Sequence, residues 1–385
     1  MKSTSRSRTP TTYRTIAHAL KAEILAGKLG PGQQLETNVK LQRRFDTTPV
    51  TVHRAVQLLV SEGFVCTREG VGVFVADRLP HLANYALVFP ADPVAPYESE
   101  LRSWSKYYQA MSAAATELQR ELGARLALFH GIGYHVDSED WQRLVDHIRS
   151  HRLAGIIFAN SPHALANTPI LDEPGIPRVM LASGSQRSGV PAITFDREQW
   201  LAQALDLLQR HGRRRLAVLF NAFDKHLLNQ VNRAFTARGL ACPPYWQQAV
   251  RWNDQGAVSH CVQLLMRGPA AERPDGLLVM DDNLVEGVTA GLVAAEVRVS
   301  ADVDVVAHAN YPLATPPALP FHVLGYDLGA ALRTGLDLID RQRQDEPVPG
   351  MTILPAIWRE DLVKAAPRAV ARKFSRQTVP AAALQ

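Results

Sequence analysis

Cysteine is scarce in this sequence, with only three among 385 residues: Cys66, Cys242 and Cys261. An odd count, with neither a CxxC pair nor a Cys/His ligand spacing, argues against a disulfide framework and against a zinc site. We therefore expect the three side chains to be buried as small apolar groups.

Long apolar runs are missing too. No stretch approaches the roughly 18 apolar residues of a membrane-spanning helix, and the basic residues 1–14 are not followed by the apolar segment of a signal peptide. Common enzyme motifs are also absent, because no GxSxG, HExxH, GxGxxG or P-loop pattern occurs. We expect a cytoplasmic protein with no cofactor, no bound metal and no catalytic residue.

Charge is distributed unevenly. Residues 1–78 hold twelve Lys or Arg against six Asp or Glu, and residues 364–385 hold five basic residues and no acidic one, although the net charge is only +5. The segment between them is therefore net acidic. A basic end on an acidic body is typical of a protein that places one end against a polyanion, although a solvated basic surface would show the same pattern. The Ala- and Pro-rich segment 364–385 is interpreted as a disordered tail, with nonspecific DNA contact as the less favoured hypothesis.

The N-terminal segment predicts a small helical module. Apolar residues at helical spacing indicate a first helix from Tyr13 to the glycine-rich turn at 27–32. Thr37 is a suitable N-cap for a short second helix that ends near Asp46.

A third helix is expected over about 49–62, because Thr48 can cap it and Pro49 suits the first helical position. Its apolar stripe faces inward, which leaves outside the side chains of Thr51, His53, Arg54 and Gln57. Two strands separated by the glycine turn 69–72 follow and predict a hairpin. A helix pair with polar and cationic side chains near the start of the second helix, followed by a wing, is suited to reading the DNA major groove.

The head contains four sequence motifs that together are typical of one protein family. They are Y-x-x-IA-x-x-L-x-x-x-I-x-x-G-x-L-x-PG-x-x-L from residue 13, T-x-x-TV at 48–52, EGF at 62–64 and G-x-G-x-FV at 70–75. Over residues 13–75 the chain resembles the winged helix-turn-helix of GntR-family regulators. The Leu-Pro-Ser turn of that family is Leu35-Glu36-Thr37 here, and arginines that contact DNA in the family fall on Val39, Pro49 and His53.

The resemblance implies DNA contacts at Thr48, Thr51 and His53, a phosphate-side position at Tyr13 and a wing tip at Gly70. Arg54 is added from helix geometry, although His53 could be an unpartnered surface histidine and Arg54 could pair with an acidic neighbour. The predicted DNA-binding residues are Tyr13, Thr37, Thr48, Pro49, Thr51, His53, Arg54, Arg68 and Gly70.

From residue 85 onward, short apolar strands alternate with amphipathic helices, which predicts parallel sheets of the doubly wound type. Strands are expected at 86–89, 126–129, 155–158, 177–181, 216–220, 276–279 and 303–306. Helices are expected near 101–122, 138–150, 197–211, 225–238 and 283–296. Two such runs indicate two lobes, and ligands in these folds bind at the carboxyl ends of the strands.

Several segments carry a second resemblance: M-x-x-AA-x-x-L-x-x-ELG at 111–123, AGIIFAN at 154–160, IP-x-VML at 176–181, HGRRRLAVLF at 211–220 and RPDGLLVMDDNLVEG at 273–287. The stretch 85–362 is similar to the sugar-binding domain of LacI/GalR regulators and periplasmic binding proteins. The GntR-type head on such a body resembles the arabinose-type repressors. The expected fold is α/β, a winged helix-turn-helix joined to a two-lobed periplasmic-binding-protein-like domain. The expected boundaries are 10–78 for the DNA-binding domain, 79–84 for a linker, 85–363 for the effector and dimerisation domain and 364–385 for the tail.

The second resemblance implies effector contacts on loops at strand ends, namely Pro90, Asp92, Asn160, Ser161, Asp196, Trp252 and Asp281. An aromatic face with convergent carboxylates suits a sugar, whose CH face stacks while its hydroxyls donate. Trp252 could instead be a packed loop aromatic, and Asp281 a helix N-cap. The family's arginine after the 216–220 strand falls on Leu227, and its aspartate after the 303–306 strand falls on Ala309. Four other indoles are expected in the core, those of Trp104, Trp141, Trp200 and Trp246.

These patterns predict a homodimeric repressor that binds double-stranded operator DNA, responds to a small polar metabolite and has no membrane partner. An enzyme of the pyridoxal-phosphate class is a competing hypothesis, since GntR-type heads also occur on such bodies. The body has few lysines, with Lys106 and Lys225 inside it and Lys364 just after its end, and none of these three lies in a Ser/Thr-rich phosphate-binding context. Two further hypotheses are a transport binding protein and a DNA-binding protein that has no ligand.

Overall fold

The computed structural model describes residues 12–94, 104–123, 125–133, 138–181, 189–221, 225–240, 242–312 and 317–365. Within them the chain forms two compact units. The first contains the N-terminal head and the residues up to Asp196, together with 310–316 and 327–354, and the second begins at Arg197. The predicted basic tail lies outside the described residues from residue 366 onward.

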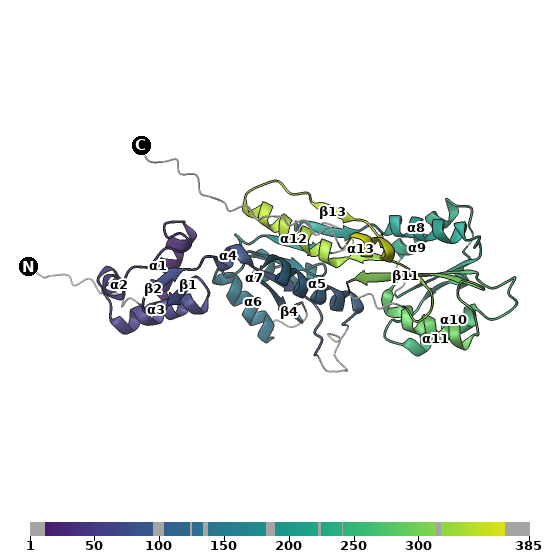
Figure 1. Cartoon of the computed structure of the whole chain (residues 1–385), viewed down its shortest axis with the longest axis horizontal. Helices are drawn as coiled ribbons and strands as arrows, with labels where there is room; N and C mark the ends of the chain where they lie inside the picture. Colours follow the sequence, from purple (N-terminus) through teal and green to yellow (C-terminus); the bar gives the residue numbers. More distant parts are fainter. Residues whose placement is uncertain are drawn as a thin grey trace, which may run out of the picture. The chain divides into compact units, whose positions relative to one another are not determined.

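The head is a three-helix module with a hairpin, drawn in purple in Figure 1. Its elements are α1 (Tyr13–Leu25), α2 (Asn38–Phe45), α3 (Pro49–Ser61), β1 (Val65–Arg68) and β2 (Gly72–Val75). Each helix begins after a threonine whose Oγ1 accepts a backbone N–H of the first turn, which confirms the predicted caps Thr37 and Thr48. The helices and hairpin enclose one apolar core that includes Ile16, Leu20, Leu41, Val52, Leu59, Phe64 and Val75.

The segment predicted as a linker, 79–84, has regular structure. It contains the one-turn helix α4 (Pro80–Ala83) and the first residue of β3 (Asn84–Val88). Proline is well suited to the first position of α4, because the N–H that it lacks would have no hydrogen-bond acceptor within the helix at this position. The connection to the first sheet is therefore short and partly helical.

The first unit contains a six-stranded sheet in which every strand pair is parallel. Its order is β13 (Met351–Leu354), β7 (Ala192–Phe195), β6 (Arg178–Leu181), β5 (Gly155–Phe158), β3 and β4 (Arg125–Phe129). Besides α1 to α4, the helices of this unit are α5 (Lys106–Leu122), α6 (Glu139–Arg149), α7 (Pro169–Asp172) and α12 (Leu328–Arg343), with the 3₁₀ turn η2 (His163–Leu165). Side chains alternate along β3, so that Leu87 packs in the cluster with α5 and α12 while Ala86 and Val88 pack in the cluster with α6. The sheet is therefore covered on both faces, as the sequence predicts.

The second unit has a six-stranded sheet in the order β14 (Ile357–Trp358), β12 (His322–Asp327), β11 (Asp304–Tyr311), β10 (Gly276–Val279), β8 (Leu216–Phe220) and β9 (Gln247–Ala249). Strands β9, β8, β10 and β11 are parallel, whereas β14 pairs with β12 in the antiparallel direction. The sequence does not predict this antiparallel pair. Its helices are α8 (Arg197–Arg210), α9 (Lys225–Thr236), α10 (Gln255–Leu265), α11 (Val285–Ala294) and α13 (Arg359–Ala365), with the 3₁₀ turns η3 (Pro244–Trp246) and η4 (Asp282–Leu284).

Helices α10 and α11 approach closely because α11 presents glycines to α10. A Cβ on Gly287 or Gly291 would lie 2.6 Å from the Cβ of Val258 or Val262, respectively. The predicted helix at 283–296 is divided between η4 and α11, which together follow the end of β10. Among the described helices, none is long and apolar enough to cross a membrane.

The expectation of buried cysteines is wrong for Cys66, which is exposed, and Cys242 and Cys261 are only partly buried. Cys66 occupies an outward position of β1, next to the buried Val65, because side chains alternate along a strand. Trp141 and Trp200 are buried, and Trp104 and Trp246 are partly buried against apolar clusters, as expected of core indoles.

Candidate DNA-binding and effector sites

The third helix of the head presents the predicted DNA-contacting side chains near its N-terminus. The hydroxyls of Thr48 and Thr51 lie 2.9 Å apart and hydrogen-bond to each other, and Pro49 is the first helical residue. His53 and Arg54 are exposed. Arg54 forms no hydrogen bond or ion pair with any residue that the structure describes, so an acidic partner for it is not observed. Its guanidinium is available to an external anion or base.

The wing is held in shape by residues from both of its strands. The Arg68 guanidinium lies over the Phe74 ring, 4.4 Å from its centroid. Gly70 has a φ of +71°, which few other residues adopt, and no atom lies within 4 Å of where its Cβ would be. The Gln34 side chain donates to the Val71 carbonyl at 3.0 Å. The wing tip therefore has an open backbone at Gly70 that a phosphate can approach.

Two other predicted residues of the head, Tyr13 and Thr37, have structural partners, and so does Arg44, which was not predicted. The Tyr13 hydroxyl accepts a hydrogen bond from Nε of Arg14 at 3.2 Å. Thr37 caps α2 through the N–H of Lys40. Arg44 is paired with Glu23 and Glu36, and hydrogen bonds to these two carboxylates raise the pKa of Arg44. Arg44 is therefore less available for DNA than the exposed Arg43 on the same helix.

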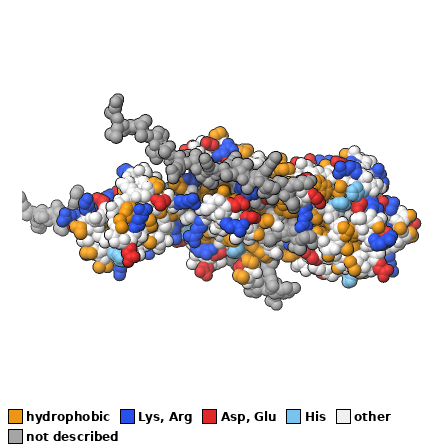
Figure 2. All heavy atoms as spheres, in the orientation of Figure 1, with side chains coloured by type: hydrophobic (Ala, Val, Ile, Leu, Met, Phe, Trp, Pro, Cys, Tyr) orange, Lys and Arg blue, Asp and Glu red, His pale blue; other side chains and the backbone are white. Residues whose placement is uncertain are grey.

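Sequence reasoning missed three exposed valines on the head. Val39 is the second residue of α2, Val50 the second residue of α3, and Val71 lies at the wing tip, and each is more than half exposed (56%, 61% and 63%). Exposed aliphatic groups beside a recognition helix can contact thymine methyl groups. The available signal in the sequence was Val39, which stands where the resembled family has an arginine. The face shown in Figure 2 carries both basic and acidic side chains, on the head as well as on the rest of the chain.

A pocket of about 320 Å³ lies in the first unit, beside the carboxyl ends of β3 and β5. Three of the predicted effector residues line it, Pro90, Asn160 and Ser161. Asp92 is not among the lining residues, and its Oδ1 accepts the backbone N–H of Val94 at 2.9 Å. The carboxyl ends of neighbouring parallel strands thus bring together loops that are distant in sequence.

Ser161 gives this pocket an unused polar group. Its Oγ is buried and has no hydrogen-bond partner among the described residues, while its backbone N–H donates to Oδ1 of Asn160 at 2.7 Å. A buried hydroxyl without a partner is costly unless a ligand or water completes its hydrogen bonds. The pocket therefore suits a ligand with a hydroxyl or another polar group at this point.

The pocket wall includes Ser105 and Tyr108 at the start of α5, which sequence reasoning missed. Tyr108 belongs to an aromatic cluster, since its ring lies 5.7 Å from Phe89 in an edge-to-face arrangement and 5.5 Å from Trp104. His130 stacks on Phe89 at 5.4 Å, and burial lowers the pKa of His130, so the neutral ring is favoured. An aromatic wall beside polar groups is the composition expected of a carbohydrate site.

The remaining predicted effector residues have structural roles at strand ends. Asp196 directly follows β7, and its backbone N–H donates to the Leu354 carbonyl at 2.8 Å. Trp252 is partly buried against the apolar cluster of the second unit, as a packed loop aromatic would be. Oδ1 of Asp281 accepts from the backbone and the side-chain nitrogen of Asn283 at 2.8 and 2.7 Å, as an N-cap would.

Trp252 and Asp281 nevertheless belong to one hydrogen-bond network of the second unit. The Gln255 side-chain nitrogen donates to the carbonyls of Trp252 and Asn283, both at 2.8 Å, and its Oε1 accepts from the Gly287 N–H at 2.7 Å. The loop before α10 is thus tied to the turn that follows β10. Their effector-binding roles stay predictions.

Known proteins match both parts of the chain. Residues 12–75 match the "Bacterial regulatory proteins, gntR family", and residues 205–360 match the "Periplasmic binding protein-like domain". An arabinose metabolism transcriptional repressor from Halalkalibacterium halodurans is 21% identical over 362 residues, covering 88% of this chain and 92% of the relative.

Solved structures show the same fold in the body. A LacI family transcriptional regulator from Lactobacillus casei with bound glucose has a TM-score of 0.52 and 17% identity, covering 71% of this chain and 97% of that one. The lac repressor dimer bound to operator and the anti-inducer ONPF also has a TM-score of 0.52, with 16% identity, covering 72% of this chain and 92% of that one.

A GntR-type helix-turn-helix head and a periplasmic-binding-protein-like body define the class of this protein. The chain is a DNA-binding transcriptional regulator. Its full-length curated relatives include repressors of arabinose metabolism.

Proposed function

We propose that this regulator is a cytoplasmic repressor whose affinity for operator DNA is controlled by a sugar or a similar polyhydroxylated metabolite bound at the first-unit pocket. The observation that carries the proposal is the pocket of about 320 Å³ with the buried, unpartnered Ser161 hydroxyl, on a chain whose head is of the GntR type. The glucose-bound LacI-type structure and the arabinose-metabolism relative support the sugar class.

The pocket supplies both kinds of contact that a sugar needs. Tyr108 offers an aromatic ring for the CH face, and Ser161 and Asn160 offer hydroxyl and amide groups for hydrogen bonds. The stacking role that the resemblance gave to Trp252 is better suited to Tyr108, because Trp252 packs against the apolar cluster of its own unit. The effector site proposed here is thus centred on the loops after β3 and β5 and on the start of α5.

On the DNA side, Arg54 is the proposed main cationic contact of the recognition helix. Changing Arg54 to Ala should weaken operator binding by about 1–3 kcal/mol if the guanidinium reads a base, and should reduce the salt slope by about one if it binds a phosphate. The operator is obtained by selection from random duplex DNA, and binding is measured by fluorescence anisotropy at several salt concentrations. Arg233→Ala is a control, because Arg233 is an exposed arginine on α9. Unchanged affinity and slope in the Arg54 variant would remove this residue from the interface.

The proposed repressor is a homodimer that recognises a two-fold operator. One winged head offers few contacts, and two heads on adjacent half-sites supply the specificity that a single module lacks. Sedimentation equilibrium at micromolar concentration should therefore give about twice the 42.4 kDa chain mass. A monomer at this concentration, together with selected sites that lack a palindrome, would contradict the proposal.

Effector and operator binding should be coupled by about 1–3 kcal/mol, and the coupling must be reciprocal because both are equilibrium binding reactions. A thermal-shift screen of the full chain with monosaccharides, beginning with arabinose and glucose, identifies the effector, since a ligand that binds only the folded state raises the melting temperature. The operator should then change the dissociation constant of the sugar by the same factor by which the sugar changes the dissociation constant of the operator. Titrations of each ligand with and without the other measure both factors. Sugar binding that leaves DNA affinity unchanged would exclude the switch and leave the sugar site in place.

A further inference from the structure

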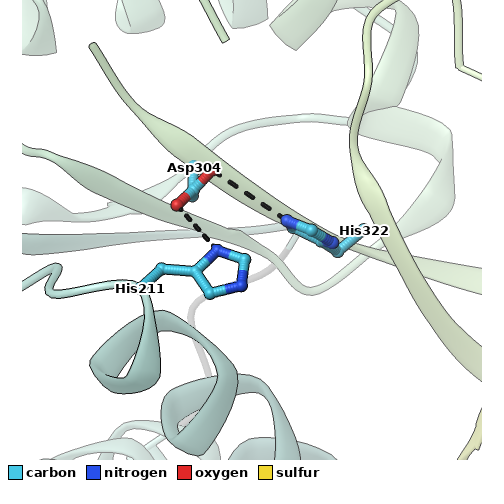
Figure 3. A group of neighbouring side chains, drawn as sticks. All are labelled: His211, Asp304 and His322. Atoms are coloured by element: carbon cyan, nitrogen blue, oxygen red, sulfur yellow. Dashed lines mark hydrogen bonds and ion pairs between the residues drawn. The ribbon is translucent and has the colours of Figure 1, made fainter. Parts of the chain in front are cut away.

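Two histidines and one aspartate of the second unit converge at a place that the proposed function does not use. His211 follows the last residue of α8, Asp304 begins β11 and His322 begins β12. Figure 3 shows both imidazole rings turned toward the Asp304 carboxylate. Asp304 lies at the amino end of β11, whereas Asp281 follows the carboxyl end of the parallel strand β10. The cluster therefore lies at the amino ends of these strands, opposite the carboxyl ends where effector contacts are expected.

The geometry of the three side chains is close to that of a metal site. Nδ1 of His211 lies 3.0 Å from Oδ2 of Asp304, and Nε2 of His322 lies 3.9 Å from Oδ1. One ligand atom from each residue can be chosen so that all lie within 4.8 Å of one another. Tetrahedral ligands at the bond lengths of zinc lie about 3.3 Å from each other, and the two measured separations, each to a different oxygen of Asp304, are of this order. Small rotations of the rings would complete the geometry, and both histidine side chains are partly exposed.

Hydrogen bonding leaves Oδ1 of Asp304 available to a metal ion, whereas Nδ1 of His211, which lies at hydrogen-bond distance from Oδ2, would release its proton when a metal binds. Nε of Arg213 donates to Oδ2 of Asp304 at 2.9 Å, and another guanidinium nitrogen donates to the Ser300 carbonyl at 2.8 Å. Arg213 thus holds the nearly buried carboxylate from one side, and Oδ1 faces His322. Such a hydrogen bond from outside the metal shell orients a ligating carboxylate.

We propose that His211, Asp304 and His322 bind one divalent transition-metal ion of the zinc type, with a fourth position open to water. Two imidazoles and a carboxylate are suited to zinc or its first-row neighbours, whereas magnesium and calcium prefer shells made only of oxygen. The sequence could not indicate this site, because His211 and Asp304 are 93 residues apart and have no motif spacing. The bound ion would join the end of α8 to the starts of β11 and β12 and stabilise the second unit.

The test uses the full chain freed of metal by a chelator that is then removed. Titration with zinc chloride at pH 7.5, followed by calorimetry, should give one ion per chain, and cobalt(II) should give the visible absorption of a tetrahedral site. His211→Ala and His322→Ala should each weaken zinc binding at least about tenfold. Asp304→Asn should do the same while keeping the shape of the buried side chain.

His260→Ala is the matched control, because His260 is an exposed histidine on α10 of the same unit. It should bind zinc like the wild type. Zinc should also raise the melting temperature of the wild type and of this control, but not of the His211 and His322 variants. The absence of zinc binding in the wild type would overturn the proposal, and so would zinc binding that survives in both histidine variants. These readouts need no sugar or operator, so they are independent of the proposed function.

Discussion

Replacing Trp200 by alanine should lower the free energy of unfolding by about 3–5 kcal/mol, the range for removal of a buried large aromatic side chain. Trp200 is only 2% exposed, and its Nε1 donates to the Leu324 carbonyl at 2.8 Å. The substitution removes the packing of α8 against the sheet and leaves a buried carbonyl without this donor. Urea denaturation followed by far-ultraviolet circular dichroism measures the loss.

Tyr245→Ala is the control for Trp200→Ala, because Tyr245 is a 66% exposed aromatic of the same unit. Its removal should change the unfolding free energy by no more than about 0.5 kcal/mol. Equal effects of the two substitutions would show that Trp200 does not anchor α8. Because His211 directly follows α8, the Trp200 variant should also bind zinc more weakly if the proposed metal site exists.

The head was predictable from sequence because its signals are local. Thr48 and Pro49 determine the start of the recognition helix within two residues, and the wing is marked by the glycines of its turn. The conformations of these residues depend on neighbours in the chain, so no distant contact was needed. What the sequence could not supply was the set of partners, such as the pairing of Arg44 with Glu23 and Glu36.

The interior strands of the body were predictable for a different reason. Strands such as β5 and β8 are buried on both faces and appear as unbroken apolar runs. Edge strands lack this signal: β9 is Gln-Gln-Ala, and β13 alternates exposed and partly buried residues. The antiparallel strand β14 has only two residues and is part of the sheet because it pairs with β12, a contact that its own sequence does not indicate.

The candidate pocket was predicted in part. Pro90, Asn160 and Ser161 follow strands whose parallel arrangement the alternation indicated, so their meeting at one sheet edge follows from the fold. Tyr108 comes from the first turn of a helix and had no such signal, because its position depends on how α5 packs against Phe89. Asp281 shows a further limit, since a carboxylate directly after a strand and before a helix has the same sequence pattern whether it caps the helix or binds a ligand.

Replacing Ser161 by phenylalanine should abolish the response to effector while operator binding is retained. Ser161 lines a pocket of about 320 Å³, and its hydroxyl is buried there, so a phenyl ring at this position would occupy the space of the ligand and remove its hydrogen-bonding partner. Affinity for the sugar found by screening should fall at least about hundredfold, equivalent to about 2.8 kcal/mol.

His163→Phe is the matched control for Ser161→Phe. His163 lies two residues further along the chain, at the start of η2, is exposed and does not line the pocket, so a phenyl ring there should leave sugar affinity unchanged. Calorimetric titration with the sugar measures affinity, and fluorescence anisotropy measures operator binding with and without it. A Ser161 variant that binds the sugar like the wild type would place the effector elsewhere. A variant that loses operator binding as well would show that the substitution disturbs more than the pocket, and Ser161→Ala, which removes only the hydroxyl, then decides whether this group contacts the effector.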